Sequence, residues 1–148
     1  MEEDTITRSI RINASAERVW SCITQPENIK QWYAFGGAEV DLRVDGKISF
    51  SWDEHGKYLG VIEAVEPLHT FAFRFVPDTA DIEPKLGNST RVEFVLAPKD
   101  DGVGLSFTES GYLSLDLSPE ERVQQKSMNE GAWDDSLKLL TELAEKVA

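Results

Sequence analysis

The spacing of the apolar residues changes sharply along this chain, and the change limits the folds that are open to it. Over much of residues 38–111, apolar and polar residues alternate, which is typical of strands with one buried face. Near the C-terminus they recur every three or four positions, which is typical of a helix with one apolar stripe. The stripe comprises Trp133, Leu137, Leu140, Ala144 and Val147. A sheet and a long helix must therefore bury their apolar faces against each other.

The first part of the chain predicts one strand and two short helices. Isoleucines of one parity indicate a strand over residues 5–12. Ser15 is suited to cap a helix over residues 16–24. Pro26 is suited to begin a second helix, which would cover residues 27–34.

Turn-forming residues divide the middle of the chain into strands. Asp-Gly pairs at 45–46 and 101–102 predict tight hairpin turns. The segment 77–88 is rich in acids and proline and predicts a loop. With the first strand, this pattern predicts six or seven antiparallel strands in total.

Two capping sequences mark the C-terminal helical region. Residues 118–121, Ser-Pro-Glu-Glu, are suited to begin a helix. A second capping sequence at 127–130 indicates a break or restart, so that the long helix would extend from Met128 to Val147. At 1.5 Å per residue it would be roughly 30 Å long and could cross a curved sheet. The helix would leave a cavity at the end that it does not fill, and the two short helices would plug part of that gap.

Composition narrows the classes of function. The 148 residues fit one domain, residues 1–148, and include 15 basic and 27 acidic side chains, a net charge of −12. Such a charge without a basic patch argues against nucleic acid and against an anionic membrane surface. One cysteine, Cys22, excludes an internal disulfide and a cysteine-rich zinc site. We expect a soluble, cytoplasmic protein with neither a signal peptide nor a membrane-inserted segment.

Several short motifs, in this order, resemble one known superfamily. They are residues 12–20, Trp32, and residues 41–46, 60–67, 104–112 and 131–133. Together they resemble the START-like, or SRPBCC, superfamily, and within it the homologues of the activator of the ninety-kilodalton heat-shock protein (HSP-90) ATPase. The resemblance covers about residues 5 to 147. One departure is Asp45, which stands where the family usually has the first of two glycines.

The resemblance implies an α+β helix-grip fold, in which a curved antiparallel sheet wraps around the long C-terminal helix. It also implies a cavity between the sheet and the helix, because START-like domains commonly bind hydrophobic molecules. The candidate ligand-binding residues are aromatic or lie at element ends near the expected mouth: Trp32, Phe35, Phe50, Trp52, Phe73, Phe107, Glu109, Tyr112 and Trp133. Each aromatic side chain could instead be plain core.

Glu109 is the most informative polar residue among these candidates. It shares parity with Leu105 and Phe107, so strict alternation would point its carboxylate inward. A buried carboxylate would need a partner, a ligand or water, or else a raised pKa. A bulge near the strand end could instead turn Glu109 outward.

Three functions are consistent with this sequence. The first is binding of a hydrophobic or amphipathic small molecule in the cavity. The second, which the family name implies, is modulation of a heat-shock protein ATPase through a protein surface, with a chaperone as partner and a role in stress response. The third is a cyclase- or aromatase-like enzyme using pocket acids. We assign no catalytic residue, metal or cofactor, and expect His55 and His69 to be solvated loop residues.

Overall fold

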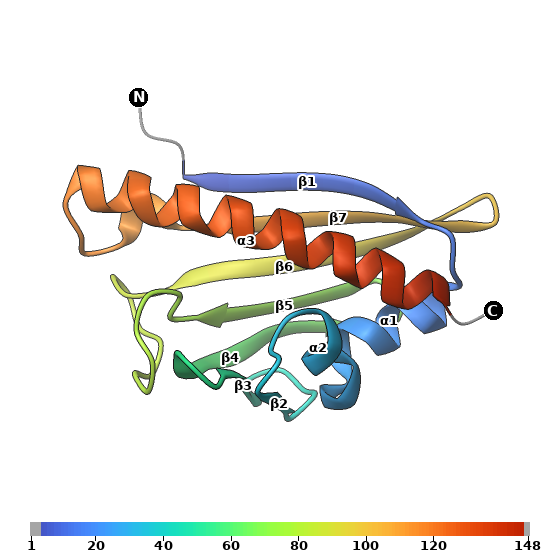
Figure 1. Cartoon of the computed structure of the whole chain (residues 1–148), viewed down its shortest axis with the longest axis horizontal. Coiled ribbons are helices and arrows are strands. Elements are labelled where there is room, and N and C mark those ends of the chain that lie inside the picture. Colours follow the sequence, from blue (N-terminus) through green and yellow to red (C-terminus); the bar gives the residue numbers. More distant parts are fainter. Residues whose placement is uncertain (1–3, 147–148) are drawn as a thin grey trace.

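A computed structural model describes residues 4–146 of the chain, and within them seven strands form one antiparallel sheet (Figure 1). The elements are β1 (Thr5–Ile12), α1 (Ala16–Thr24), α2 (Pro26–Trp32), β2 (Gly37–Val40), β3 (Lys47–Trp52), β4 (Gly56–Glu66), β5 (Thr70–Phe75), β6 (Thr90–Lys99), β7 (Gly102–Ser110), the 3-10 helix η1 (Tyr112–Ser114) and α3 (Pro119–Lys146). The strand order is β1-β7-β6-β5-β4-β3-β2. This arrangement confirms the predicted helix-grip fold.

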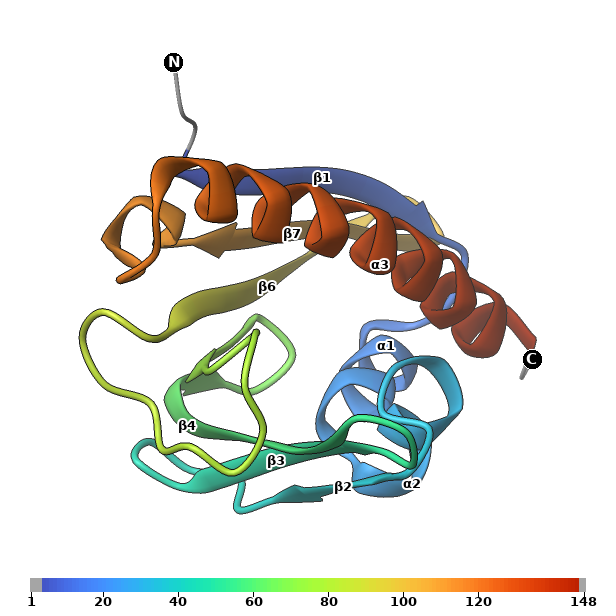
Figure 2. The same cartoon turned by 60° about the vertical axis from the view of Figure 1, so that its left-hand side comes forward.

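The sheet is strongly curved, and all three α-helices lie on its concave side (Figure 2). α3 lies along the β1 and β7 side of the sheet, while α1 and α2 fill the space under its C-terminal half. α3 contacts both short helices and β1. The two short helices therefore occupy one end of the concave side, under the C-terminal half of α3, and leave the other end to the first half of α3.

The concave face of the sheet forms the core together with one stripe of α3. On β5, Phe71 and Phe73 belong to the hydrophobic core, and Phe94 of β6 packs against Trp32 and Trp133. Burying each such side chain contributes about 1.5–3 kcal/mol. The stripe residues Trp133, Leu137, Leu140 and Ala144 are buried as predicted, whereas Val147 lies outside the described residues.

The N-terminal half of α3 differs from the prediction. The helix runs without a break from Pro119 to Lys146, so the expected restart near Met128 was wrong. Only the first capping sequence is used: the backbone N–H of Glu121 donates to Ser118 Oγ at 3.2 Å, and the Glu121 carboxylate accepts from the Ser118 N–H at 3.0 Å. Ser127 is exposed in the middle of the helix. A capping-box sequence can occur inside a helix, because exposed Ser and Glu side chains do not force the backbone to leave it.

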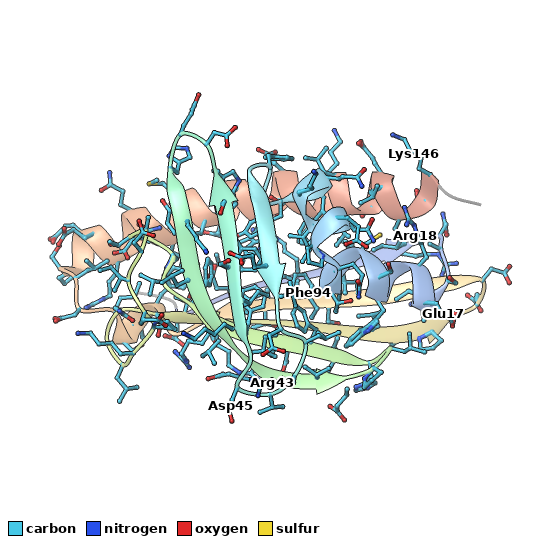
Figure 3. The ribbon with its side chains drawn as sticks, turned by 90° about the horizontal axis from the view of Figure 1, so that it is seen from below. Glu17, Arg18, Arg43, Asp45, Phe94 and Lys146 are labelled. Carbon is cyan, nitrogen blue, oxygen red and sulfur yellow. The ribbon has the colours of Figure 1, made fainter. Side chains whose placement is uncertain are left out.

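α1 is tied to the end of α3 by Arg18. Its guanidinium donates to the backbone carbonyl of Leu143 at 3.0 Å. Figure 3 shows Arg18 on the side of α1 that faces the end of α3 at Lys146. A cation is favourable there because helix C-termini carry partial negative charge.

The turn before β3 accounts for the departure at Asp45. Asp45 adopts a left-handed backbone with φ 68°, which Asp tolerates. At Gly46, a Cβ atom would lie 2.0 Å from the Asp41 carbonyl oxygen. The Asp45 N–H donates to the Ile62 carbonyl, and the Ile62 N–H donates to the Gly46 carbonyl, both at 2.8 Å. The turn thus needs glycine at position 46 and accepts aspartate at 45.

Candidate functional site

A cavity of about 420 Å³ opens between the middle of α3 and the neighbouring ends of β3, β4 and β5. Its sheet side is formed by Trp52 at the end of β3, Tyr58 of β4 and Phe75 of β5. Tyr33 and Phe35 line it from the segment after α2. It lies where α1 and α2 no longer separate α3 from the sheet. The cavity thus lies along the middle of α3 and not at the end of the helix where a gap was expected.

One face of α3 forms the opposite wall. The lining residues of α3 are Gln125, Met128, Asn129, Ala132, Trp133, Asp135, Ser136 and Leu139. They recur at three- and four-residue spacing along nearly four turns. This face lies beside the buried stripe of Leu137, Leu140 and Ala144 on the helix surface. One face of α3 therefore packs in the core, and the adjacent face lines the cavity.

Tyr33 holds the aromatic wall together. Its ring stacks on Trp133 with centroids 4.6 Å apart and planes 13° apart. Trp52 meets Tyr33 edge-on at 5.0 Å and donates from its indole N–H to the Tyr33 carbonyl at 2.7 Å. Tyr58 in turn packs edge-on against Trp52 at 5.5 Å. These contacts fix the rings in place while leaving their free faces and edges to the cavity.

Three exposed apolar side chains line the cavity. Phe35, Met128 and Leu139 line it and are 57%, 65% and 38% exposed. They come from two separate segments of the chain, the segment after α2 and α3, and line the same cavity. Exposed apolar side chains that gather at one concave site indicate contact with an apolar partner or ligand.

A buried carboxylate lies behind this wall. Glu109 of β7 is fully buried, and one of its oxygens accepts from the Trp133 indole N–H at 2.9 Å and from the Tyr112 hydroxyl. Its other oxygen accepts from the Thr90 hydroxyl at 2.6 Å. The amide of Asn129 donates to the Tyr112 oxygen at 2.7 Å and lies 3.5 Å from the carboxylate. Glu109 therefore points inward, and the alternative of an outward bulge was wrong.

Burial governs the titration of these groups. Desolvation raises the pKa of Glu109 above its ordinary value, although hydrogen bonds from Thr90, Tyr112, Trp133 and Asn129 act in the opposite direction. Burial, and then the neighbouring Glu109 charge, raises the pKa of Tyr112 far above its usual range. Tyr112 is thus a hydrogen-bond donor at all ordinary pH values.

The structure separates the predicted site residues into three groups. Phe35, Trp52 and Trp133 line the cavity. Trp32, Phe50, Phe73 and Phe107 lie in the packed core instead. Glu109 and Tyr112 lie behind the wall, and Trp133 and Asn129 connect them to the cavity.

Several residues that line the cavity were not among the ligand-binding residues predicted from the sequence. Tyr33 falls within the helix that was predicted over residues 27–34, and its role in the wall depends on α2 ending at Trp32. Asn129 was interpreted only as part of a capping sequence, yet it bridges the cavity and the buried carboxylate. The spacing of Asn129 and Trp133, four residues apart on a helix, was the available signal that they share a face. His55 is exposed at the rim.

Neither a metal centre nor a membrane span emerges from residues 4–146. No group of three or more His, Cys, Asp or Glu side chains in this range is placed to hold a metal ion. None of the helices there combines the length and the apolar character needed to cross a membrane.

Comparison with known proteins places the chain among similar folds. A family model described as Activator of Hsp90 ATPase homolog 1-like protein matches residues 13–145. A crystal structure of the Mesorhizobium loti protein MLL2253 superposes with a TM-score of 0.79 at 22% identity, covering 97% of this chain and 98% of that one. No curated protein matches.

Two further structures share the fold. The solution structure of the Aha1 dimer from Colwellia psychrerythraea has a TM-score of 0.76 at 18% identity and covers 97% of each chain. The crystal structure of CalU16 from Micromonospora echinospora has a TM-score of 0.69 at 22% identity and covers 95% of this chain and 75% of that one. At these identities the similarity establishes a common START-like fold.

Proposed function

The chain belongs to the family of Activator of Hsp90 ATPase homolog 1-like proteins, and from this premise we propose that its cavity binds a hydrophobic or amphipathic small molecule. The observation that carries the proposal is the open, aromatic-lined cavity between α3 and the ends of β3, β4 and β5. Its volume of about 420 Å³ lies within the range of small-molecule sites.

The apolar rim supports this proposal energetically. Phe35, Met128 and Leu139 remain exposed, so a ligand that covers them removes apolar surface from water. The gain is about 25 cal/mol for each Å² that is covered. A bound ligand would thus recover the hydrophobic stabilisation that the folded chain leaves unused at this site.

A few polar groups would orient the ligand. Gln125, Asn129 and Ser136 line the cavity on the α3 side, and the Gln125 amide donates to Asn129 at 3.1 Å. Asn129 is itself fixed by Tyr112, so its position does not depend on the ligand. Few polar groups held in place within an apolar cavity are typical of a specific binding site.

The enzyme hypothesis has less support in this geometry. A general acid or base must come within hydrogen-bond reach of the reacting group. Glu109 lies behind Trp133 and Asn129, so it does not meet the cavity directly. The acid that lines the cavity is Asp135, which lies on α3. The imidazole that lines it is His55, which lies in the turn between β3 and β4.

A dye-binding experiment tests the proposal. N-phenyl-1-naphthylamine, a neutral apolar dye, is titrated into the full chain and its fluorescence is recorded. The variant Ser136→Phe places a ring in the cavity, and the control Ser127→Phe places the same ring on an exposed position of the same helix that does not line it. We expect Ser136→Phe to weaken dye binding at least about tenfold, equivalent to about 1.4 kcal/mol, and Ser127→Phe to leave it unchanged.

Two results would contradict binding in the cavity. If the dye fails to bind, or both variants behave like the parent chain, the cavity is not the binding site. Modulation of a heat-shock protein ATPase through a protein surface, which the family name suggests, would then be the function to test.

A further inference from the structure

The cavity lining holds an acidic side chain and, among its described residues, no lysine or arginine, and this limits the ligand further. We propose that the ligand carries a positive charge, as a substituted ammonium group on an apolar body; this inference rests on the proposed binding function. Of the described residues that line the cavity, none is Lys or Arg, while Asp135 is acidic. A carboxylate or phosphate ligand would find no cation there to pair with.

The residues that flank the lining add to the negative potential. Asp53 and Glu54 directly precede His55 in the turn between β3 and β4, and Asp78 directly follows Pro77. All three are exposed. These acids come from the β3–β4 turn and from the segment after β5, and Asp135 comes from α3, so each of these segments supplies both a lining residue and an acid.

Two of the three lysines that neighbour lining residues, Lys57 and Lys126, are paired with acids; the third, Lys138, directly precedes Leu139 on α3 and is exposed. Lys57 precedes Tyr58 on β4, so its side chain leaves the opposite face of the sheet, where it forms an ion pair with Glu39 at 2.5 Å. Lys126 follows Gln125 on α3 and pairs with Glu130 at 3.5 Å, on the helix side that also contacts Arg8 of β1. Neither of these two paired lysines offsets the acids of the cavity.

The aromatic wall suits a cation as well as an apolar group. Tyr33, Trp52 and Tyr58 are half-buried rings that line the cavity, whereas Trp133 is buried and stacks on Tyr33. The face of an indole or phenol ring attracts an ammonium group by its quadrupole, and a group of such rings is the usual site for quaternary ammonium ligands. An apolar tail would be covered by Phe35, Met128 and Leu139 at the rim.

Three probes of equal chain length test the sign of the charge. Decyltrimethylammonium, 1-decanol and decanoate compete separately with bound N-phenyl-1-naphthylamine, below the concentrations at which they form micelles. The titrations use about 150 mM salt, at which exposed charges more than about 8 Å away are largely screened. They are run at about pH 8, above the range in which histidine ordinarily titrates.

We expect decyltrimethylammonium to displace the dye at a concentration about tenfold or more below that of decanoate, and also below that of 1-decanol. Equal displacement by all three probes, or displacement led by decanoate, would overturn the charge assignment while leaving the binding function intact. Failure of the dye itself to bind would overturn the proposed function and this inference with it.

Two matched variants test whether a negative charge inside the cavity, and not the acidity of the whole protein, attracts the cationic probe. Asp135→Asn removes one negative charge from the cavity, and Glu142→Gln removes one from an exposed position of the same helix outside it. We expect Asp135→Asn to weaken decyltrimethylammonium binding about threefold or more without changing 1-decanol binding, and Glu142→Gln to change neither. Equal losses in the two variants would show a general attraction of cations to an acidic protein, which would contradict the inference.

A third variant tests the aromatic contribution. Trp52→Leu keeps an apolar side chain in the cavity wall and removes the indole π system. The expected result is a selective loss of decyltrimethylammonium affinity, with 1-decanol binding retained as evidence that the site is still folded. Parallel losses for both probes would mean that Trp52 contributes only apolar contact.

Discussion

Replacing Glu109 is the sharpest test of how the wall behind the cavity is held. Its carboxylate accepts from the Trp133 indole at 2.9 Å, the Thr90 hydroxyl at 2.6 Å and the Tyr112 hydroxyl. Glu109→Ala would leave these donors buried without an acceptor. Each unsatisfied donor costs about 1–3 kcal/mol, and local relaxation recovers part of it, so the expected loss of unfolding free energy is about 3–5 kcal/mol.

Glu109→Gln is the matched control, because glutamine keeps the shape and one acceptor oxygen. That oxygen can still accept from Tyr112 and Trp133, while the Thr90 hydroxyl can turn and accept from the new amide. Burial already disfavours the charged form of Glu109, so losing the charge costs little. We expect a change of about 1 kcal/mol or less at neutral pH.

Urea unfolding followed by tryptophan fluorescence and circular dichroism measures both values. Similar losses for the two variants would refute the reasoning, since hydrogen-bond satisfaction would then not be what Glu109 contributes. A loss below about 1 kcal/mol for Glu109→Ala would refute it as well.

The pH dependence gives an independent check on the same residue. The pKa of Glu109 is raised in the folded state, so the folded chain binds this proton more tightly than the unfolded chain does. The stability that Glu109 contributes is therefore present below its unfolded pKa and is lost as the pH rises through the folded pKa. The parent chain should lose stability relative to Glu109→Gln over that interval.

Two backbone predictions follow from the glycines. Gly131→Ala should raise the free energy of unfolding by about 0.5–1 kcal/mol, as measured by urea titration. Gly131 lies inside α3, and an added Cβ atom would meet nothing within 4 Å. A loss of stability would contradict this prediction. Gly46→Ala should lower the free energy of unfolding by about 1–3 kcal/mol and so lower the melting temperature. The reason is that its Cβ atom would lie 2.0 Å from the Asp41 carbonyl oxygen. An unchanged melting curve would contradict the turn geometry.

The fold could be predicted from the sequence because its signals are local and repeated. The alternation through Phe71, Phe73 and Phe75 defines one buried face of β5, and the α3 stripe requires a sheet to cover it. The restart near Met128 was predicted wrongly for a local reason. A capping sequence fits an exposed helix interior as well as a helix start, and sequence alone does not distinguish them.

The site was predictable only in part, because its geometry depends on distant contacts. Parity suggested an inward Glu109, but its donors Thr90, Asn129 and Trp133 lie 19 to 24 residues away in sequence. Phe50 and Trp52 share one face of β3, yet Phe50 is core and Trp52 borders the cavity. Which of them meets a ligand depends on where α2 ends and where α3 crosses the sheet.

The central claim, binding in the cavity, is tested most directly by the four tryptophan indole N–H signals in a two-dimensional ¹⁵N–¹H NMR spectrum. Trp52 and Trp133 line the cavity, whereas Trp32 is bonded to the Cys22 carbonyl in the core and Trp20 packs on Phe71. Titration with N-phenyl-1-naphthylamine should shift the Trp52 and Trp133 signals and leave the other two in place. Four unmoved signals, or equal shifts of all four, would contradict a ligand site in this cavity.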